Sequence, residues 1–192
     1  MGKLVKHELS LETRMSKTQL VPGRSLVGVL ALGLALISGL FPATAQGAPS
    51  SPEDRARFVS ITRTLEEAPL RPGARGDREW ALRWLTEVPD VSVNICLSSL
   101  GGMEEGYQYA GEIMLQYTFS MAVLVIQHPE IAADPNARQV AGVAGALRAY
   151  RAILGSRPDA RSPGLDSLME IEGRGGLPEF ILARSASCST AT

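Results

Sequence analysis

Lysine is absent from most of this sequence, and histidine and cysteine are scarce. All three lysines come before residue 20, and residues 46–192 contain one histidine (His128) and two cysteines (Cys96 and Cys188). Without lysine this part can form neither a Schiff base nor a phosphate-binding P-loop. A zinc site normally draws several ligands from His and Cys, and a serine nucleophile of the hydrolase type sits in a Gly-x-Ser-x-Gly turn, which the sequence lacks. We therefore predict no metal, no cofactor and no assignable catalytic residue.

Net positive charge is also lacking after the first 45 residues. Those 45 residues hold five of the 19 Lys and Arg and two of the 20 Asp and Glu, which leaves 14 arginines, 18 acids and a net charge of −4 for residues 46–192. Nucleic-acid binding requires a basic surface that neutralises phosphates. We therefore expect no nucleic-acid partner.

The first 45 residues have the order of segments found in a secretory signal peptide. A basic start precedes an apolar run over residues 25–41, Pro42 ends the run, and Ala43-Thr44-Ala45 supplies small residues for a signal peptidase. We expect cleavage after Ala45 and export, to the periplasm or the extracellular space. The alternative is an uncleaved anchor, since the 17-residue run is just short of the ~18 to 20 residues that span a membrane. A start at Met15 instead of Met1 would give a more ordinary leader.

Residues 51–184 show the spacing of apolar residues that is typical of helices. Ser51, Asp134 and Ser162 each precede a proline, which predicts a capped helix start, and Asp77 is expected to cap another helix. Residues 91–100 alternate like a strand but also fit a helix face; because a lone strand is not viable, we predict a helix. The prediction is an all-α fold, a single bundle of about six to seven helices, between a short linker (46–50) and a flexible tail (185–192). The expected helices span residues 51–68, 77–88, 91–100, 104–127, 135–155, 163–171 and 178–183.

The two cysteines suggest one disulfide, because residues 46–192 are expected in an oxidising compartment. A bond between Cys96 and Cys188 would close a loop of 92 residues and stabilise the fold by about 4 to 5 kcal/mol in the chain-entropy model. The alternative is that Cys96 is a buried apolar residue and that Cys188 lies in the flexible tail.

The most apolar expected helix, 104–127, should lie at the centre of the bundle, since a helix that is apolar on most sides is surrounded by others. A thin polar stripe follows it, and if this stripe faces the interior, Glu112 needs a partner such as Arg148 or Arg151. The interpretation that we favour is a solvent-exposed stripe. The stripe comprises Gln108, Glu112, Gln116 and Ser120.

Small residues on the expected helix 135–155 predict that another helix crosses it closely; they are Ala141, Gly142, Gly145 and Ala146. The second half of this helix resembles the second helix of a tetratricopeptide repeat over 13 residues, at Ala146, Tyr150, Ile153, Leu154 and Pro158. The pattern of the first repeat helix does not precede it, and no period of ~34 residues recurs. An ordinary amphipathic helix gives the same spacing, and we favour it.

Three functions remain open for an exported helical protein. The first is a non-enzymatic interaction or scaffold module of the cell envelope, whose unknown protein partner would dock on an exposed apolar patch around Trp80 and Tyr107. The second is a bundle that binds a small ligand or lipid, and the third and least favoured is a hydrolase-type enzyme. The sequence does not assign an oligomeric state, and no membrane span is expected after Ala45. The ligand-binding slot would be formed by Glu112, Gln116, Ser120 and Arg148.

Overall fold

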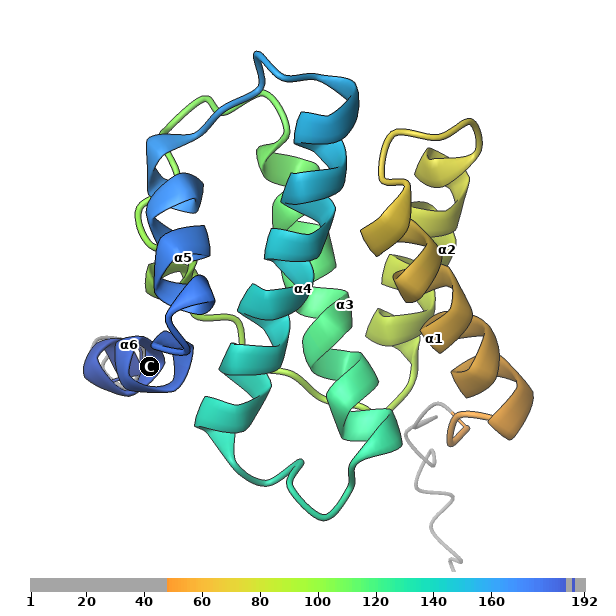
Figure 1. The fold of residues 1–192 in the computed structure, drawn as a ribbon. Coiled ribbons are helices and arrows are strands. Elements are labelled where there is room, and N and C mark those ends of the chain that lie inside the picture. The colour runs from red at the N-terminus through yellow and green to blue at the C-terminus, as the bar shows by residue number, and fades with distance from the viewer. Residues whose placement is uncertain (1–47, 186–187, 189–192) are drawn as a thin grey trace, which may run out of the picture. The chain divides into compact units, whose positions relative to one another are not determined.

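The computed structural model describes residues 48–185 and residue 188, and this part of the chain is all-helical, as predicted. The expected signal peptide and its cleavage site after Ala45 lie outside the described residues. Figure 1 shows the order of the elements along the chain. They are α1 (Pro52–Glu67), α2 (Ala74–Glu87), the 3₁₀ helix η1 (Leu97–Leu100), α3 (Ala110–Gln127), α4 (Pro135–Ser156), α5 (Pro163–Gly173) and α6 (Leu177–Ser185).

Three helices begin where a capping residue and a proline predict a start. The side chain of Ser51 accepts the N–H of Asp54 at 3.0 Å. Asp134 and Ser162 cap α4 and α5 in the same way. Because each cap satisfies an N–H that the helix itself leaves without a partner, the start is fixed by local sequence.

Two other helices begin at residues different from those predicted. Helix α2 begins one turn before Asp77, because Gly73 adopts a positive φ of 85° and its carbonyl accepts the N–H of Asp77 at 3.1 Å. Helix α3 begins at Ala110, not at Glu104. Gly106 turns the chain with a φ of 80°, and Glu104 instead contacts the start of α5.

The predicted helix over residues 91–100 is wrong except for η1. Residues 91–96 have no regular secondary structure, and side chains of the long helices bind the backbone at Asn94 and Cys96. The Tyr117 hydroxyl accepts the N–H of Cys96 at 3.1 Å and lies 3.1 Å from its carbonyl oxygen, while Gln139 donates to the carbonyl of Asn94 at 2.7 Å. The segment therefore needs neither a helix nor a partner strand, because polar backbone groups are satisfied from outside.

Helices α3 and α4 lie side by side between α1 and α2 on one side and α5 and α6 on the other (Figure 1). The predicted close crossing on α4 is confirmed. A β-carbon at Gly142 would lie 2.7 Å from the ring of Tyr117, and one at Gly145 would lie 1.9 Å from Ser120 Oγ. The two helices therefore touch at positions where α4 has no side chain.

Most buried apolar residues in the described part of the chain belong to two clusters. One is built around Tyr117 and Tyr150 and joins α3 to α4, α5 and α6. The other is built around Phe58, Trp84 and Phe119, whose rings pack with centroids 4.7 Å and 5.5 Å apart, and it joins α3 to α1 and α2. Helix α3 contributes to both clusters, which explains why it is apolar on most sides.

The C-terminal part of the described chain contacts the helical bundle. Helix α6 includes Ser185, the first residue of the expected tail, and Cys188 lies at disulfide distance from Cys96, with the two Cα atoms 5.7 Å apart. Within residues 48–185, no helix has both the length and the apolar character to cross a membrane.

Candidate functional site

A cluster of polar side chains lies where α1, α3 and α4 meet, and we call Glu66, Gln116, Ser120 and Arg148 the polar cluster. Glu66 comes from the last turn of α1, and its side chain is 12% exposed. Arg148 of α4 donates to the two carboxylate oxygens of Glu66 from Nε and Nη2, both at 2.8 Å. Ser120 of α3 donates to Oε1 of the same carboxylate at 2.9 Å. Three helices therefore converge on one carboxylate.

Gln116 and Ser120 are buried, with 3% and 5% exposure, so this part of the polar stripe faces the interior and not the solvent. The Gln116 amide nitrogen lies 3.1 Å from Ser120 Oγ and 3.3 Å from the carbonyl of Thr62. Since buried polar groups cost free energy unless they are bonded, these contacts fix the rotamers of both side chains.

Gly145 is what allows the polar cluster to form. Besides the contact with Ser120, a β-carbon at this position would lie 2.9 Å from Oε1 of Glu66. Arg148 follows three residues later on the same face of α4. A larger residue at position 145 would hold α4 away from Glu66 and lengthen the Arg148–Glu66 contacts.

The alternative in which Glu112 pairs with Arg148 or Arg151 is wrong. Glu112 lies in the first turn of α3, where α2 packs, and it is half-buried beside Arg78. Arg148 pairs with Glu66, and Arg151 pairs with Glu172 of α5. Gln108 precedes α3 and is exposed, Glu112 lies beside α2, and Gln116 and Ser120 face α1 and α4, so the members of the stripe do not share one environment.

A hollow of about 280 Å³ lies beside the polar cluster, and we call it the α1–α3–α4 hollow. Arg63 spans its rim by donating from Nη2 to the Gln127 amide oxygen at 3.1 Å. A larger hollow of about 620 Å³ lies along α1 and shares Arg63 and Gln127 with the first, but none of the polar cluster lines it. The α1–α3–α4 hollow is lined by Thr62, Arg63, Glu66, Ser120, Val123, Leu124, Gln127, His128, Ala141, Ala144 and Arg148.

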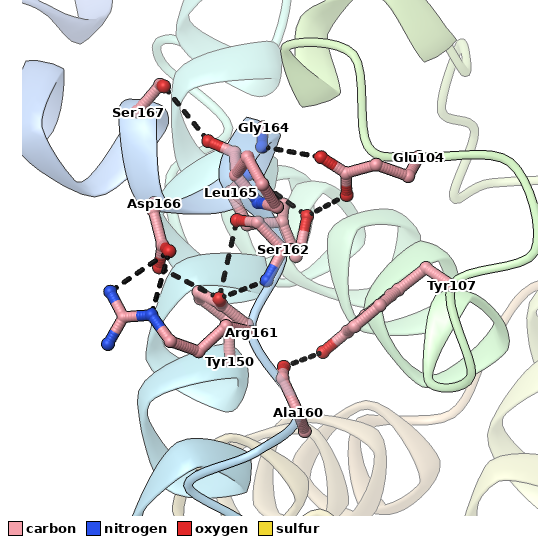
Figure 2. A network of polar contacts seen from close by, with 11 residues as sticks. Glu104, Tyr107, Tyr150, Ala160, Arg161, Ser162, Gly164, Leu165, Asp166 and Ser167 are labelled. Atoms are coloured by element: carbon pink, nitrogen blue, oxygen red, sulfur yellow. Dashed lines mark hydrogen bonds and ion pairs between the residues drawn. The ribbon is translucent and has the colours of Figure 1, made fainter.

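A second polar network surrounds the start of α5 (Figure 2). The Glu104 carboxylate accepts the hydroxyl of Ser162 and, at 2.9 Å, the N–H of Gly164. These bonds, the hydroxyl first, lower the pKa of Glu104. The Tyr150 hydroxyl accepts the N–H of Ser162 at 2.8 Å and lies 2.9 Å from a carboxylate oxygen of Asp166. Every member is bonded to its neighbours, so this network holds α5 in place.

The expected apolar patch around Trp80 and Tyr107 is not formed. The Arg57 guanidinium covers Trp80 at 4.0 Å from the ring centroid, and the Tyr107 hydroxyl donates to the carbonyl of Ala160 at 3.0 Å. Burial raises the pKa of Tyr107 to about 12. Both rings are half-buried and are therefore parts of the fold.

Exposed apolar side chains occur instead beside the disulfide. Ile95 and Leu97, which flank Cys96, are 55% and 59% exposed, and Leu182 on α6 is 61% exposed. Helix α6 packs against η1, which begins at Leu97. We call Ile95, Leu97 and Leu182 the disulfide-flanking surface.

Among the described residues, no group of three or more His, Cys, Asp or Glu side chains is placed to hold a metal ion. Comparison with protein-family models, with curated proteins and with solved structures finds no match to this chain.

Proposed function

We propose that this protein is an exported, non-enzymatic helical protein that binds a small ligand in the α1–α3–α4 hollow. The observation that carries the proposal is the polar cluster at the wall of the hollow. Glu66, Ser120 and Arg148 come from three helices, line the same space and fix one another by hydrogen bonds at 2.8 to 2.9 Å. Ligand sites typically combine a few fixed polar groups with apolar walls, which Val123 and Leu124 supply here.

The state of Glu66 favours binding over acid–base chemistry. Its two oxygens already accept four hydrogen bonds, two from Arg148, one from Ser120 and one, at 3.4 Å, from Gln116. A general base needs an oxygen that is free to take the proton of a substrate. The carboxylate instead acts as the anchor that holds Arg148 at the wall.

Two features support export. The order of segments in residues 1–45 is that of a signal peptide. Cys96 and Cys188 lie at disulfide distance, and disulfides persist mainly in oxidising compartments outside the cytosol.

The test is a native mass spectrum of the protein purified gently from its own host. We expect extra mass on the folded protein, and we expect Ala144→Leu, which fills the α1–α3–α4 hollow, to abolish it. The matched control is Ala56→Leu, because the exposed Ala56 lines only the larger hollow along α1. Loss of the extra mass in Ala56→Leu alone would assign the ligand to the other hollow, and a bare protein would contradict the proposal.

A protein partner is the second candidate function, and the disulfide-flanking surface favours it. Its three side chains are each more than half exposed. Leu182 lies on α6, which packs against η1, and exposed apolar side chains on neighbouring elements are typical of interaction sites. Crosslinking in the host should then capture a partner with the unchanged protein and not with Leu97→Asp; capture that is equal for both would contradict this candidate.

A further inference from the structure

We infer that the ligand of the α1–α3–α4 hollow is a small carboxylate with a short apolar chain, bound through Arg63 and Arg148. This inference rests on the proposed function and adds the chemical class of the ligand. It starts from the charges of the lining. The charged lining residues are Arg63, Arg148 and Glu66, so with His128 counted as neutral the wall carries one excess positive charge. The surrounding residues 46–192 have a net charge of −4, so this excess is local.

Arg63 supplies the excess charge. Its hydrogen bond joins Nη2 to the neutral amide of Gln127, and within the described residues it forms no ion pair. An arginine without a carboxylate partner at the rim of a hollow can accept an anion in bidentate geometry.

Arg148 is the second arginine of the lining and comes from α4, whereas Arg63 comes from α1. Arg148 uses Nε and Nη2 for Glu66, and Nη1 donates to no other described residue. Its side chain is 49% exposed, whereas that of Glu66 is 12% exposed. The guanidinium of Arg148 thus binds Glu66 through Nε and Nη2, while the N–H groups of Nη1 can donate to a ligand.

The size and lining of the hollow favour a monoanion with a short apolar chain. Val123, Leu124, Ala141 and Ala144 give the hollow an apolar floor. A volume of about 280 Å³ is at the lower end of ligand sites, which typically begin near ~300 Å³. The hollow also adjoins the C-terminal end of α3, where the helix dipole is negative. One excess positive charge there suits a carboxylate better than a doubly charged phosphate.

The experiment is calorimetric titration with butyrate, hexanoate and octanoate, with 1-hexanol, hexylamine and inorganic phosphate as comparison probes. We expect binding of a carboxylate of this series and none of the comparison probes. Arg63→Gln should weaken carboxylate binding about tenfold or more, which corresponds to about 1.4 kcal/mol. Arg83→Gln is the matched control, because Arg83 is an exposed arginine of α2 that does not line the hollow, and its affinity should not change.

Two results would overturn this inference and leave the proposed function standing. One is hexanol or phosphate binding as tightly as the carboxylates, or an affinity unchanged in Arg63→Gln. The other is that none of the carboxylates binds, while the protein from its host carries a mass that Ala144→Leu abolishes. A bare protein from the host that also binds no probe would refute both.

Discussion

Replacing Gly145 by alanine is the most direct perturbation of the polar cluster. The added methyl group would lie 1.9 Å from Ser120 Oγ and 2.4 Å from its β-carbon, so rotation of the serine hydroxyl cannot relieve the clash. Overpacking of this kind costs about 1–3 kcal/mol. Displacing the hydroxyl also weakens its hydrogen bond to the Glu66 carboxylate, which contributes roughly 1.5–3 kcal/mol. The higher helix propensity of alanine offsets about 1 kcal/mol of this loss, because glycine is unfavourable inside a helix. We therefore expect a net loss of about 1.5–5 kcal/mol in the free energy of unfolding.

The assay is urea unfolding monitored by circular dichroism, compared with Gly155→Ala in the same helix. No atom outside the local backbone lies within 4 Å of a β-carbon at Gly155, and this residue is exposed. The control should be neutral or up to about 1 kcal/mol more stable. In the double variant Gly145→Ala with Ser120→Gly, the two costs should be less than additive, because removal of the serine side chain removes the clash. If Gly145→Ala behaves like Gly155→Ala, the close approach of α3 and α4 at this point is wrong.

Three further predictions test the remaining features. Glu66→Gln should lower the free energy of unfolding by about 1–2 kcal/mol. Glu112→Gln should change it by less than ~0.5 kcal/mol, because within the described residues that carboxylate forms no ion pair. Equal effects of the two variants would argue against the polar cluster. Replacing Cys96 and Cys188 by serine should cost about 2–5 kcal/mol, and alkylation of either thiol in the folded, unreduced protein would show that the bond is not formed. The lowered pKa of Glu104 means that its hydrogen bonds stabilise the fold above the unfolded pKa of ~4.3, and that this contribution is lost as the pH falls through the folded pKa. Glu104→Gln should therefore have a lower free energy of unfolding than the unchanged protein at neutral pH, and the difference should disappear in acid. A difference that stays constant with pH would refute the role of this carboxylate.

The features that the sequence predicted correctly depend on neighbouring residues. The starts at Ser51, Asp134 and Ser162 need only a cap and the proline beside it. The starts of α2 and α3 were missed because a glycine with positive φ, Gly73 or Gly106, decides them. Glycine is compatible with either sign of φ, so its presence alone does not fix the turn.

The candidate site was predicted in part, and the missing residue was its anchor. Gln116 and Ser120 were identified from the stripe, but Glu66 was not. Glu66 and Glu67 are adjacent at the end of α1, and only the rotation of that helix against α3 and α4 makes one of them the partner of Arg148. The available signal was on α4, where Gly145 and Arg148 share a face. The glycine indicates the close approach of another helix, and the arginine on the same face offers donors to an acceptor on that helix or on a neighbouring one.

The same face of α4 explains both the packing and the hollow. Ala141, Ala144, Gly145 and Arg148 recur at the spacing of one helix face. Because Gly145 has no side chain, Ser120 packs directly against the backbone of α4 there. The small side chain of Ala144, in contrast, leaves space at the hollow. Ala144→Leu adds three carbons to a space of about 280 Å³ and should therefore retain stability while it blocks the ligand. Gly145→Ala adds one carbon where there is no space and should lose stability. If Ala144→Leu is stable but binds no ligand, while Gly145→Ala is destabilised, then Gly145 is required for helix packing and Ala144 for the space that the ligand occupies.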